Sequence, residues 1–270
     1  QPEAGALRIG VRNDVPQLRM ILDQAIAAIS TEEHRAIRER WLQMAEGAVV
    51  ERDIGLTADE RAWLRAHPVI RVGCDPDWAP IESRDVSGNW RGISIDYLER
   101  LNRLLGVRFE IDDVHTWQEA QAHAHSGRID LITSSADTPE RRREWALTAQ
   151  YATFPIAIFA RSEVGYLHGL ESLIGNRVAV VTGYVEAEIL RRAGRGIDVV
   201  EVANTRAGLE QVRLGTVRAF VGSLLPTAYQ LQSEGDLSIH VVGETPYAHH
   251  HAMAVRRNQP ELLAILNKAL

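Results

Sequence analysis

The chain has 270 residues, of which 45% are hydrophobic and 24% are charged, and its formal net charge is −6. These values are ordinary for a globular protein large enough to form two lobes. The negative charge excludes the basic footprint of a protein that binds nucleic acid. The single cysteine, Cys74, excludes an internal disulfide, and no apolar run approaches the roughly 20 residues of a membrane-spanning helix.

Strand-like and helix-like segments alternate along the chain, which indicates parallel α/β sheets. The run VIRVGC at 69–74 is apolar and β-branched, as is typical of a strand buried on both faces. A first series is predicted to contain strands 69–74, 107–114 and 129–135, with helices at 94–105, 115–127 and from 138. A second series is predicted to contain strands 177–183, 197–202, 217–223 and 237–243, with helices at 184–193, 205–214 and 224–233.

The two series meet near 152–165, and this break predicts two lobes. A strand at 252–257 and a helix after Pro260 follow the second series and are expected to return to the first lobe. The chain would then cross between the lobes twice, which makes a hinge and a cleft that can close on a small ligand. We therefore predict an α/β fold of two lobes, with two mostly parallel sheets joined by a two-strand hinge. Lobe 1 is expected at 68–160, lobe 2 at 161–243 and the return to lobe 1 at 244–270.

The two ends of the chain carry a similar pattern of strand, turn, proline and helix. Residues 7–26 and 251–270 align without gaps with seven identities in 20 positions, among them Pro16 with Pro260. Residues 1–45 are therefore expected to be the C-terminal strand and helix of a preceding tandem domain. The alternative is a chance similarity, because strand–turn–proline–helix is a common arrangement.

A second boundary is predicted at 46–67, as a linker followed by a short helix. Thr57 and Glu60 have the spacing of a capping box, and Pro68 ends the helix immediately before the first strand. From this point the chain resembles a known family. The stretch LTADERAWLRAHPVIRVGCDPDWAPIE at 56–82 is similar to the start of the family 3 periplasmic solute-binding fold, as found in the Venus-flytrap domains of BvgS- and EvgS-type hybrid sensor histidine kinases.

The resemblance continues in order through the rest of the chain. Its further motifs are GNWRGISIDYLERL, SGRIDLITSSADTPERRREW, LIGNRVAVVTGYVEAEIL, GTVRAFVGSLLPTAYQL and AMAVRRNQPELLAILNKAL. It implies a periplasmic ligand-sensing domain of an inner-membrane kinase, with a tandem flytrap domain in the same chain and a homodimeric full-length protein. Such a domain signals by lobe closure and is not itself an enzyme.

Two other function classes remain open at this point. One is a free-standing solute-binding protein that delivers its ligand to a transporter. The other is an enzyme on the same fold, which would need a poised acid or base in the cleft. Asp75, Asp77 and Glu82 lie near the first crossing, but nothing in the sequence pairs them with a base.

Trp78 is the first candidate for ligand contact. It follows the first strand in DPDWAP, and the carboxyl ends of the strands of an α/β sheet face a crevice. Its indole can stack on a flat or apolar part of a ligand, and the family usually has an aromatic residue at this position. The alternative is that Trp78 only packs at the hinge.

The stretch SSADTPERR at 134–142 predicts an anion-binding group. Thr138 has the pattern of an N-cap with Pro139 at the first helical position, so backbone N–H groups would point into the crevice. Ser134 and Ser135 add hydroxyl donors, and Arg141 can pair with a carboxylate. In amino-acid-binding relatives, the position of Arg141 holds the ligand carboxylate and that of Ser134 assists. The alternative is a surface arginine paired with a glutamate of its own helix.

Lobe 2 departs from the pattern of the amino-acid-binding relatives. Thr182, Gly183 and Tyr184 follow its first strand, where those relatives place small hydroxyl residues after the glycine. Ser223 stands where they place the aspartate that pairs with the ligand ammonium group. A buried ammonium group without that carboxylate would be costly. We therefore expect a small carboxylate or another anion, with a flat ring against Trp78 or Tyr184, or a domain held closed by its own contacts without a ligand.

No cofactor and no metal are expected. Patterns for nucleotide cofactors and nucleophilic catalysis are missing at useful positions, and the ten histidines do not have a ligand spacing such as HExxH. His249, His250 and His251 are consecutive, so in an extended strand their side chains alternate between two faces. Titration of these histidines near the hinge is a separate hypothesis, because histidine changes charge near neutral pH.

Overall fold

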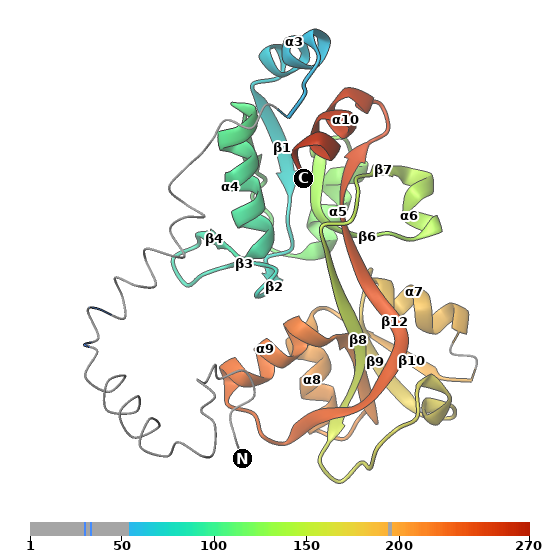
Figure 1. Ribbon diagram of the computed structural model, residues 1–270. Helices are drawn as coiled ribbons and strands as arrows, with labels where there is room; N and C mark the ends of the chain where they lie inside the picture. Colours follow the sequence, from blue (N-terminus) through green and yellow to red (C-terminus); the bar gives the residue numbers. More distant parts are fainter. Residues whose placement is uncertain (1–29, 31–32, 34–53, 194–195) are drawn as a thin grey trace, which may run out of the picture. The chain divides into compact units, whose positions relative to one another are not determined.

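The computed structural model describes residue 30, residue 33, 54–193 and 196–270 (Figure 1). The chain divides into two units, residues 1–53 and residues 54–270, and the account below concerns the second. The predicted repeat at 1–45 thus lies outside the described residues, apart from 30 and 33. None of the described helices has the length and apolar character needed to cross a membrane.

Lobe 1 is built around a parallel sheet. Strand β1 (Val69–Gly73) lies between β5 (Arg108–Ile111) and β6 (Leu131–Ala136) and is parallel to both. Helices α4 (Ile93–Leu105), α5 (Trp117–His125) and α10 (Pro260–Ala269) pack on this sheet. In α4, apolar residues recur at intervals of three or four and are buried, and the helix ends at Gly106 in the left-handed conformation.

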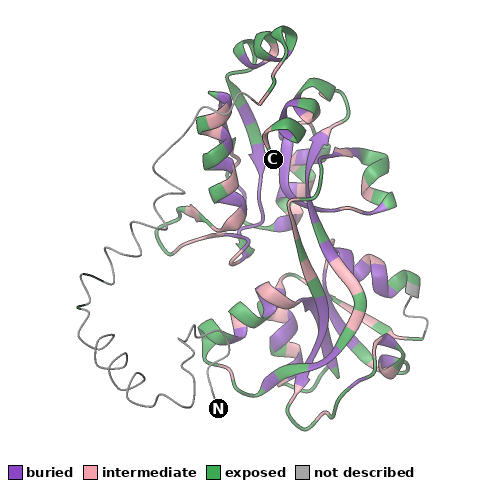
Figure 2. Ribbon diagram, in the orientation of Figure 1, coloured by how far each residue is buried: buried purple, intermediate pink, exposed green. Residues whose placement is uncertain are grey.

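Lobe 2 repeats this plan with a second parallel sheet. Strand β9 (Arg177–Val181) lies between β10 (Asp198–Val202) and β11 (Ala219–Ser223). Helices α7 (Val185–Ala193), α8 (Thr205–Arg213) and α9 (Leu224–Glu234) accompany these strands. Buried residues are concentrated in the strands and on the helix faces directed at them (Figure 2). The α/β character of both lobes agrees with the prediction from sequence.

Two long antiparallel strands connect the lobes, β8 (Ala152–Arg161) and β12 (Ile239–Arg256). In lobe 2, β8 pairs with β11, and in lobe 1, β12 pairs with β6, so the two sheets are continuous in the order β10-β9-β11-β8-β12-β6-β1-β5. The prediction of separate strands at 237–243 and 252–257 was wrong in this respect. Pairing with β8 keeps the chain extended between them, through register shifts at Val241/Gly243 and Glu244/Ala248.

Several short elements were not predicted. Strands β2 (Asp77–Trp78), β3 (Glu82–Arg84) and β4 (Trp90–Arg91) form a small antiparallel sheet after β1, and β7 (Trp145–Leu147) adds to the edge of β12. Strands of two or three residues are too short for a recognisable period. The capping box of helix α3 (Ala58–Ala66), in contrast, is confirmed, with Thr57 and Glu60 bonded reciprocally.

Candidate functional site

The site lies between the lobes, where a loop of lobe 2 contacts three segments of lobe 1. We call Thr182, Gly183 and Tyr184, which connect β9 to α7, the latch loop. The carbonyl oxygen of Gly183 accepts a hydrogen bond from Arg141 Nη2 at 2.9 Å and a longer one from Trp117 Nε1 at 3.4 Å. The carbonyl oxygen of Thr182 accepts one from Gln118 Nε2 at 3.4 Å. The cleft is therefore closed by contacts of the protein itself.

Tyr184 extends from the latch loop into lobe 1. Its hydroxyl group donates a short hydrogen bond to Asp75 Oδ2, in the loop after β1. Its ring centroid lies 5.4 Å from that of Trp78 and 6.3 Å from that of Trp117, and the residue is only 9% exposed. Burial raises the pKa of Asp75 to about 6, although the bond from Tyr184 opposes this shift.

Arg141 is held by partners on lobe 2. It lies in helix α6 (Pro139–Glu144), and the predicted N-cap is present, because the Thr138 hydroxyl accepts from the Arg141 backbone N–H at 3.2 Å. The guanidinium group bonds Glu188 Oε1 at 3.3 Å, and the Thr138 hydroxyl donates to Glu188 Oε2 at 3.2 Å. The predicted anion anchor thus has a carboxylate of α7 as its counter-ion, rather than a glutamate of its own helix.

The two predicted serines face different surroundings. Ser134 is buried inside lobe 1, where its hydroxyl lies 2.9 Å from Glu82 Oε2 and 2.8 Å from the Ser94 hydroxyl. Burial raises the pKa of Glu82 to about 7, against hydrogen bonds from Thr133, the Asp75 backbone N–H and Ser134. Ser134 therefore helps to satisfy a buried carboxyl group. Ser135 instead lines a pocket between the lobes.

That pocket has a volume of about 180 Å³, which is less than the roughly 300–1,000 Å³ of a typical ligand pocket. Its aromatic walls are Trp117, Trp145 and Tyr184, and its polar lining includes Ser135, Arg141 and Glu188. Only a small molecule fits without further opening of the lobes.

Ser223 lies at the end of β11 and bonds a carboxyl group that the sequence analysis missed. Its hydroxyl donates to Glu186 Oε1 at 3.2 Å and lies 3.5 Å from His249 Nδ1. Glu186 Oε2 is buried without a hydrogen-bond partner, and burial raises the pKa of this residue to about 7. The position was expected to lack a carboxylate, but α7 supplies a carboxyl group beside it.

Two of the three consecutive histidines take part in the site. His249 and His251 point to the same side of β12, with ring centroids 4.1 Å apart, and the His251 ring stacks on Trp78 at 4.9 Å and 13°. His250 is exposed. Burial lowers the pKa of His249 far below its usual range and that of His251 to about 3, so both rings are neutral at ordinary pH. Strand alternation predicted this shared face, but the sequence did not show that it meets Trp78.

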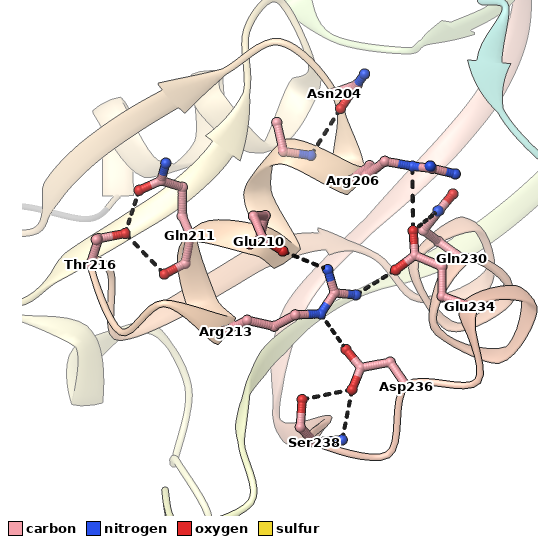
Figure 3. Close-up of polar contacts among 11 residues, drawn as sticks. Asn204, Arg206, Glu210, Gln211, Arg213, Thr216, Gln230, Glu234, Asp236 and Ser238 are labelled. Carbon is pink, nitrogen blue, oxygen red and sulfur yellow. Dashed lines mark hydrogen bonds and ion pairs between the residues drawn. The ribbon is translucent and has the colours of Figure 1, made fainter.

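A second contact between the lobes lies near Asp77. Asn204 Nδ2 donates to Asp77 Oδ2 at 3.0 Å, while Asn204 Oδ1 caps helix α8. Arg213, at the other end of α8, pairs with Glu210, Glu234 and Asp236 and so joins α8 to α9 and the loop after it (Figure 3). Among the described residues, no cluster of histidine, cysteine, aspartate or glutamate is arranged to hold a metal ion.

The eight residues predicted for the site are thus only partly brought together. Trp78, Arg141, Gly183 and Tyr184 meet at the interface between the lobes, and Thr182 contacts it through its carbonyl oxygen. Ser135 borders the pocket, whereas Ser134 and Ser223 serve buried carboxyl groups. Residues missed by the sequence analysis are Asp75 as a partner of Tyr184, Trp117, Glu186, Glu188, His249 and His251.

Two α/β lobes, joined by two crossing strands and facing each other with aromatic and charged side chains, define a protein of the flytrap solute-binding class. The chain belongs to the bacterial extracellular solute-binding proteins, family 3, whose family model matches residues 70–270. The resemblance noted from the sequence is confirmed.

Three relatives are informative. The virulence sensor protein BvgS of Bordetella pertussis is 28% identical over 98% of this chain and 22% of its own length. The crystal structure of its periplasmic VFT2 domain matches with a TM-score of 0.71 at 26% identity, over 79% of this chain and 91% of that one. The sensor protein EvgS of Escherichia coli K12 is 24% identical over 94% of this chain and 21% of its length. A histidine kinase sensor domain similar to periplasmic binding proteins matches at 27% identity with a TM-score of 0.71, over 75% and 89% of the two chains. This chain therefore spans about a fifth of the length of BvgS and EvgS.

Proposed function

We propose that this chain is the periplasmic ligand-sensing part of a two-component sensor histidine kinase. It would bind a small solute between its lobes and signal through the degree of lobe closure. The observation that carries the proposal is the double contact of the latch loop, Arg141 with Gly183 and Tyr184 with Asp75, which spans the cleft. The similarity to BvgS, EvgS and a kinase sensor domain supports the downstream partner.

The solute is proposed to be a small carboxylate or another anion. Arg141 faces the pocket together with Ser135, and a planar guanidinium group suits a carboxylate. The carboxylate of Glu188 now pairs with Arg141, so a bound anion would replace Glu188 as the partner of Arg141. A solute shifts a conformational equilibrium only by the difference between its affinities for the two states. Exchange of Glu188 for a ligand carboxylate provides such a difference, because it breaks one contact between the lobes.

We also propose that this part of the protein acts by binding and not by catalysis. Asp75 and Glu82, the acidic residues near the first crossing, are buried and accept hydrogen bonds from Tyr184, Thr133 and Ser134. Within the described part of the chain, neither is paired with a histidine that could serve as a base. The full-length protein is proposed to be an inner-membrane homodimer with a tandem flytrap domain, and a truncation series of the whole gene product would test both features.

The binding proposal is tested by a thermal-shift screen of the chain against small carboxylates, amino acids and ring acids. A ligand at 100 times its Kd adds about 2.7 kcal/mol, which for a unit of this size shifts Tm by roughly 5–10 °C. The shift should disappear in Arg141→Ala and persist in Arg143→Ala, which changes an exposed arginine of the same helix. If no compound shifts the Tm of the wild-type chain or of Arg143→Ala, the solute proposal is wrong.

The kinase proposal needs the full-length protein. Arg141→Ala and Arg143→Ala would be compared in cells by phosphorylation of the cognate response regulator. Arg141→Ala is expected to change the basal signal, because it removes two contacts between the lobes. An unchanged signal, with normal protein levels, would exclude lobe closure as the input to the kinase.

A further inference from the structure

Tyr184 occupies the cleft in the manner of a bound ligand. Its backbone belongs to lobe 2, but its side chain is enclosed by groups of lobe 1. The ring contacts two indoles, tilted by 60° to that of Trp78 and edge-on at 79° to that of Trp117, and the hydroxyl group reaches the carboxylate of Asp75. Aromatic pairs at 4.5–7 Å contribute beyond the area that they bury. The phenol is thus contacted both at its ring and at its polar end.

The receiving groups are held in place without help from Tyr184. Asp75 Oδ1 accepts from the Asp77 backbone N–H at 2.9 Å, and the Asp75 backbone N–H donates to Glu82 at 2.7 Å. Trp78 is stacked on His251 of the crossing strand β12. A subsite whose walls are fixed by other contacts keeps its shape when its occupant leaves.

The approach of the phenol depends on the turn before it. Gly183 has φ of +77°, in the left-handed region that glycine adopts at low cost. A Cβ atom at this position would lie 2.7 Å from Gln121 Oε1, so the turn also packs against α5. The latch loop therefore delivers Tyr184 to lobe 1 from a closely fitted turn.

We propose that Tyr184 is an intramolecular ligand: its phenol fills a lobe 1 subsite made by Trp78, Trp117 and Asp75, and this subsite binds a free phenol when residue 184 lacks the ring. The class of compound follows from the chemistry of the walls. Two indoles select a flat ring, and a carboxylate at the far end selects a hydrogen-bond donor and disfavours an anion. This inference goes beyond the proposed function and stands on the geometry of the cleft alone.

The test is binding of phenol, which is the part of the tyrosine side chain that alanine lacks, to Tyr184→Ala. We expect phenol to raise the Tm of this variant at pH 7.5 and to bind about tenfold more tightly than benzene, which has no donor. Wild type and Tyr184→Phe should not respond, since a ring already fills the subsite. Equal responses of wild type and Tyr184→Ala, or equal affinities for phenol and benzene, would overturn the proposal.

A second variant keeps the proposal testable if Tyr184→Ala does not fold. Tyr184→Phe retains the ring in the subsite and loses only the donor to Asp75, so its Tm should be lower than that of wild type. An unchanged Tm would contradict the intramolecular ligand. Neither experiment uses the natural solute or the kinase. A negative result for the Tyr184 subsite therefore does not contradict the solute proposal, and a negative solute screen does not contradict the subsite.

Discussion

The carboxylate of Glu60 lies 2.7 Å from the ammonium group of Lys268, so that an ion pair joins helix α3 to helix α10. Lys268 also donates to the carbonyl oxygen of Gly55. The first and last helices of the described unit 54–270 are therefore bonded to each other. We expect a movement of one helix to displace the other.

Glu60→Gln should weaken this joint while leaving the capping box intact, because glutamine also serves at that position. The hydrogen bond from Lys268 is the main cause of the lowered pKa of Glu60. The stabilisation is thus present above the ordinary glutamate pKa and is lost as pH falls through the lowered value. We expect Tm to fall at pH 7, and the difference from wild type to shrink in acid. Asp59→Asn, an exposed change in the same helix, is the control, and an equal effect of both would refute the role of the ion pair.

Gly183→Ala should destabilise the closed cleft. A left-handed alanine costs roughly 1–2 kcal/mol, and its Cβ would also lie within contact of Gln121. Gly88→Ala is the matched control, because Gly88 has φ of +82° but open space around it. Differential scanning calorimetry should show the larger loss of Tm for Gly183→Ala, and Gln121→Ala should restore part of it. Identical losses for the two glycine variants would show that the contact with Gln121 is unimportant.

Glu188→Gln should increase the affinity of the cleft for small anions. The change removes the negative charge that now pairs with Arg141 and keeps a side chain of similar shape. Exposed or half-buried pairs are worth up to about 1 kcal/mol, so we expect acetate or a larger carboxylate to bind up to about fivefold more tightly by isothermal titration. Glu140→Gln at the rim of the same pocket serves as comparison. Weaker binding by Glu188→Gln would mean that Arg141 is not the anion anchor.

His251→Phe should reduce the loss of stability in acid. Neither ring nitrogen of His251 has a hydrogen-bond partner, and burial lowers its pKa to about 3, whereas an unfolded histidine titrates near 6.5. As pH falls, the histidine is protonated in the unfolded chain but stays neutral in the folded chain. Between pH 7 and pH 5 this difference lowers the free energy of unfolding by about 2 kcal/mol. Urea unfolding at both pH values would measure the difference. His240→Phe changes an exposed histidine of the same strand and should leave the slope as in wild type; an equally steep slope in His251→Phe would refute the argument.

Local signals in the sequence predicted the elements well. The capping box at Thr57, the N-cap at Thr138 and the glycine at 106 each act within a few residues, so their outcome did not depend on the rest of the fold. The apolar run of β9 likewise predicted a buried strand. The prediction that β1 is buried on both faces was wrong, because Val69 and Arg71 are exposed while Ile70 and Val72 are buried. The extent of β12 was not predictable in this way, because its middle part is held extended by a partner strand that is distant in sequence.

The site was predicted less completely for a related reason. Trp78, Arg141 and Tyr184 stand at the ends of strands or at a helix start, where a crevice is expected. Their actual partners, Asp75, Trp117 and Glu188, depend on how one lobe docks on the other, and no spacing along the chain encodes that geometry. The hydrogen bond of Ser134 to the buried carboxyl group of Glu82 was not predicted, because Glu82 lies on a strand too short to recognise in the sequence.

The continuous ladder between β8 and β12 has a consequence for how the lobes move. Because the two strands are paired from Ile239 to Glu244 and again from Ala248 to His251, a change of angle between the lobes must be spread along the ribbon as twist, with the two register shifts as the places that yield. Backbone amides within that ribbon should therefore exchange slowly with deuterium in every state of the cleft, whereas amides of the latch loop should exchange faster when it opens. The paired strands β8 and β12 determine the direction in which the lobes rotate, and the contacts of the latch loop determine how often the cleft opens.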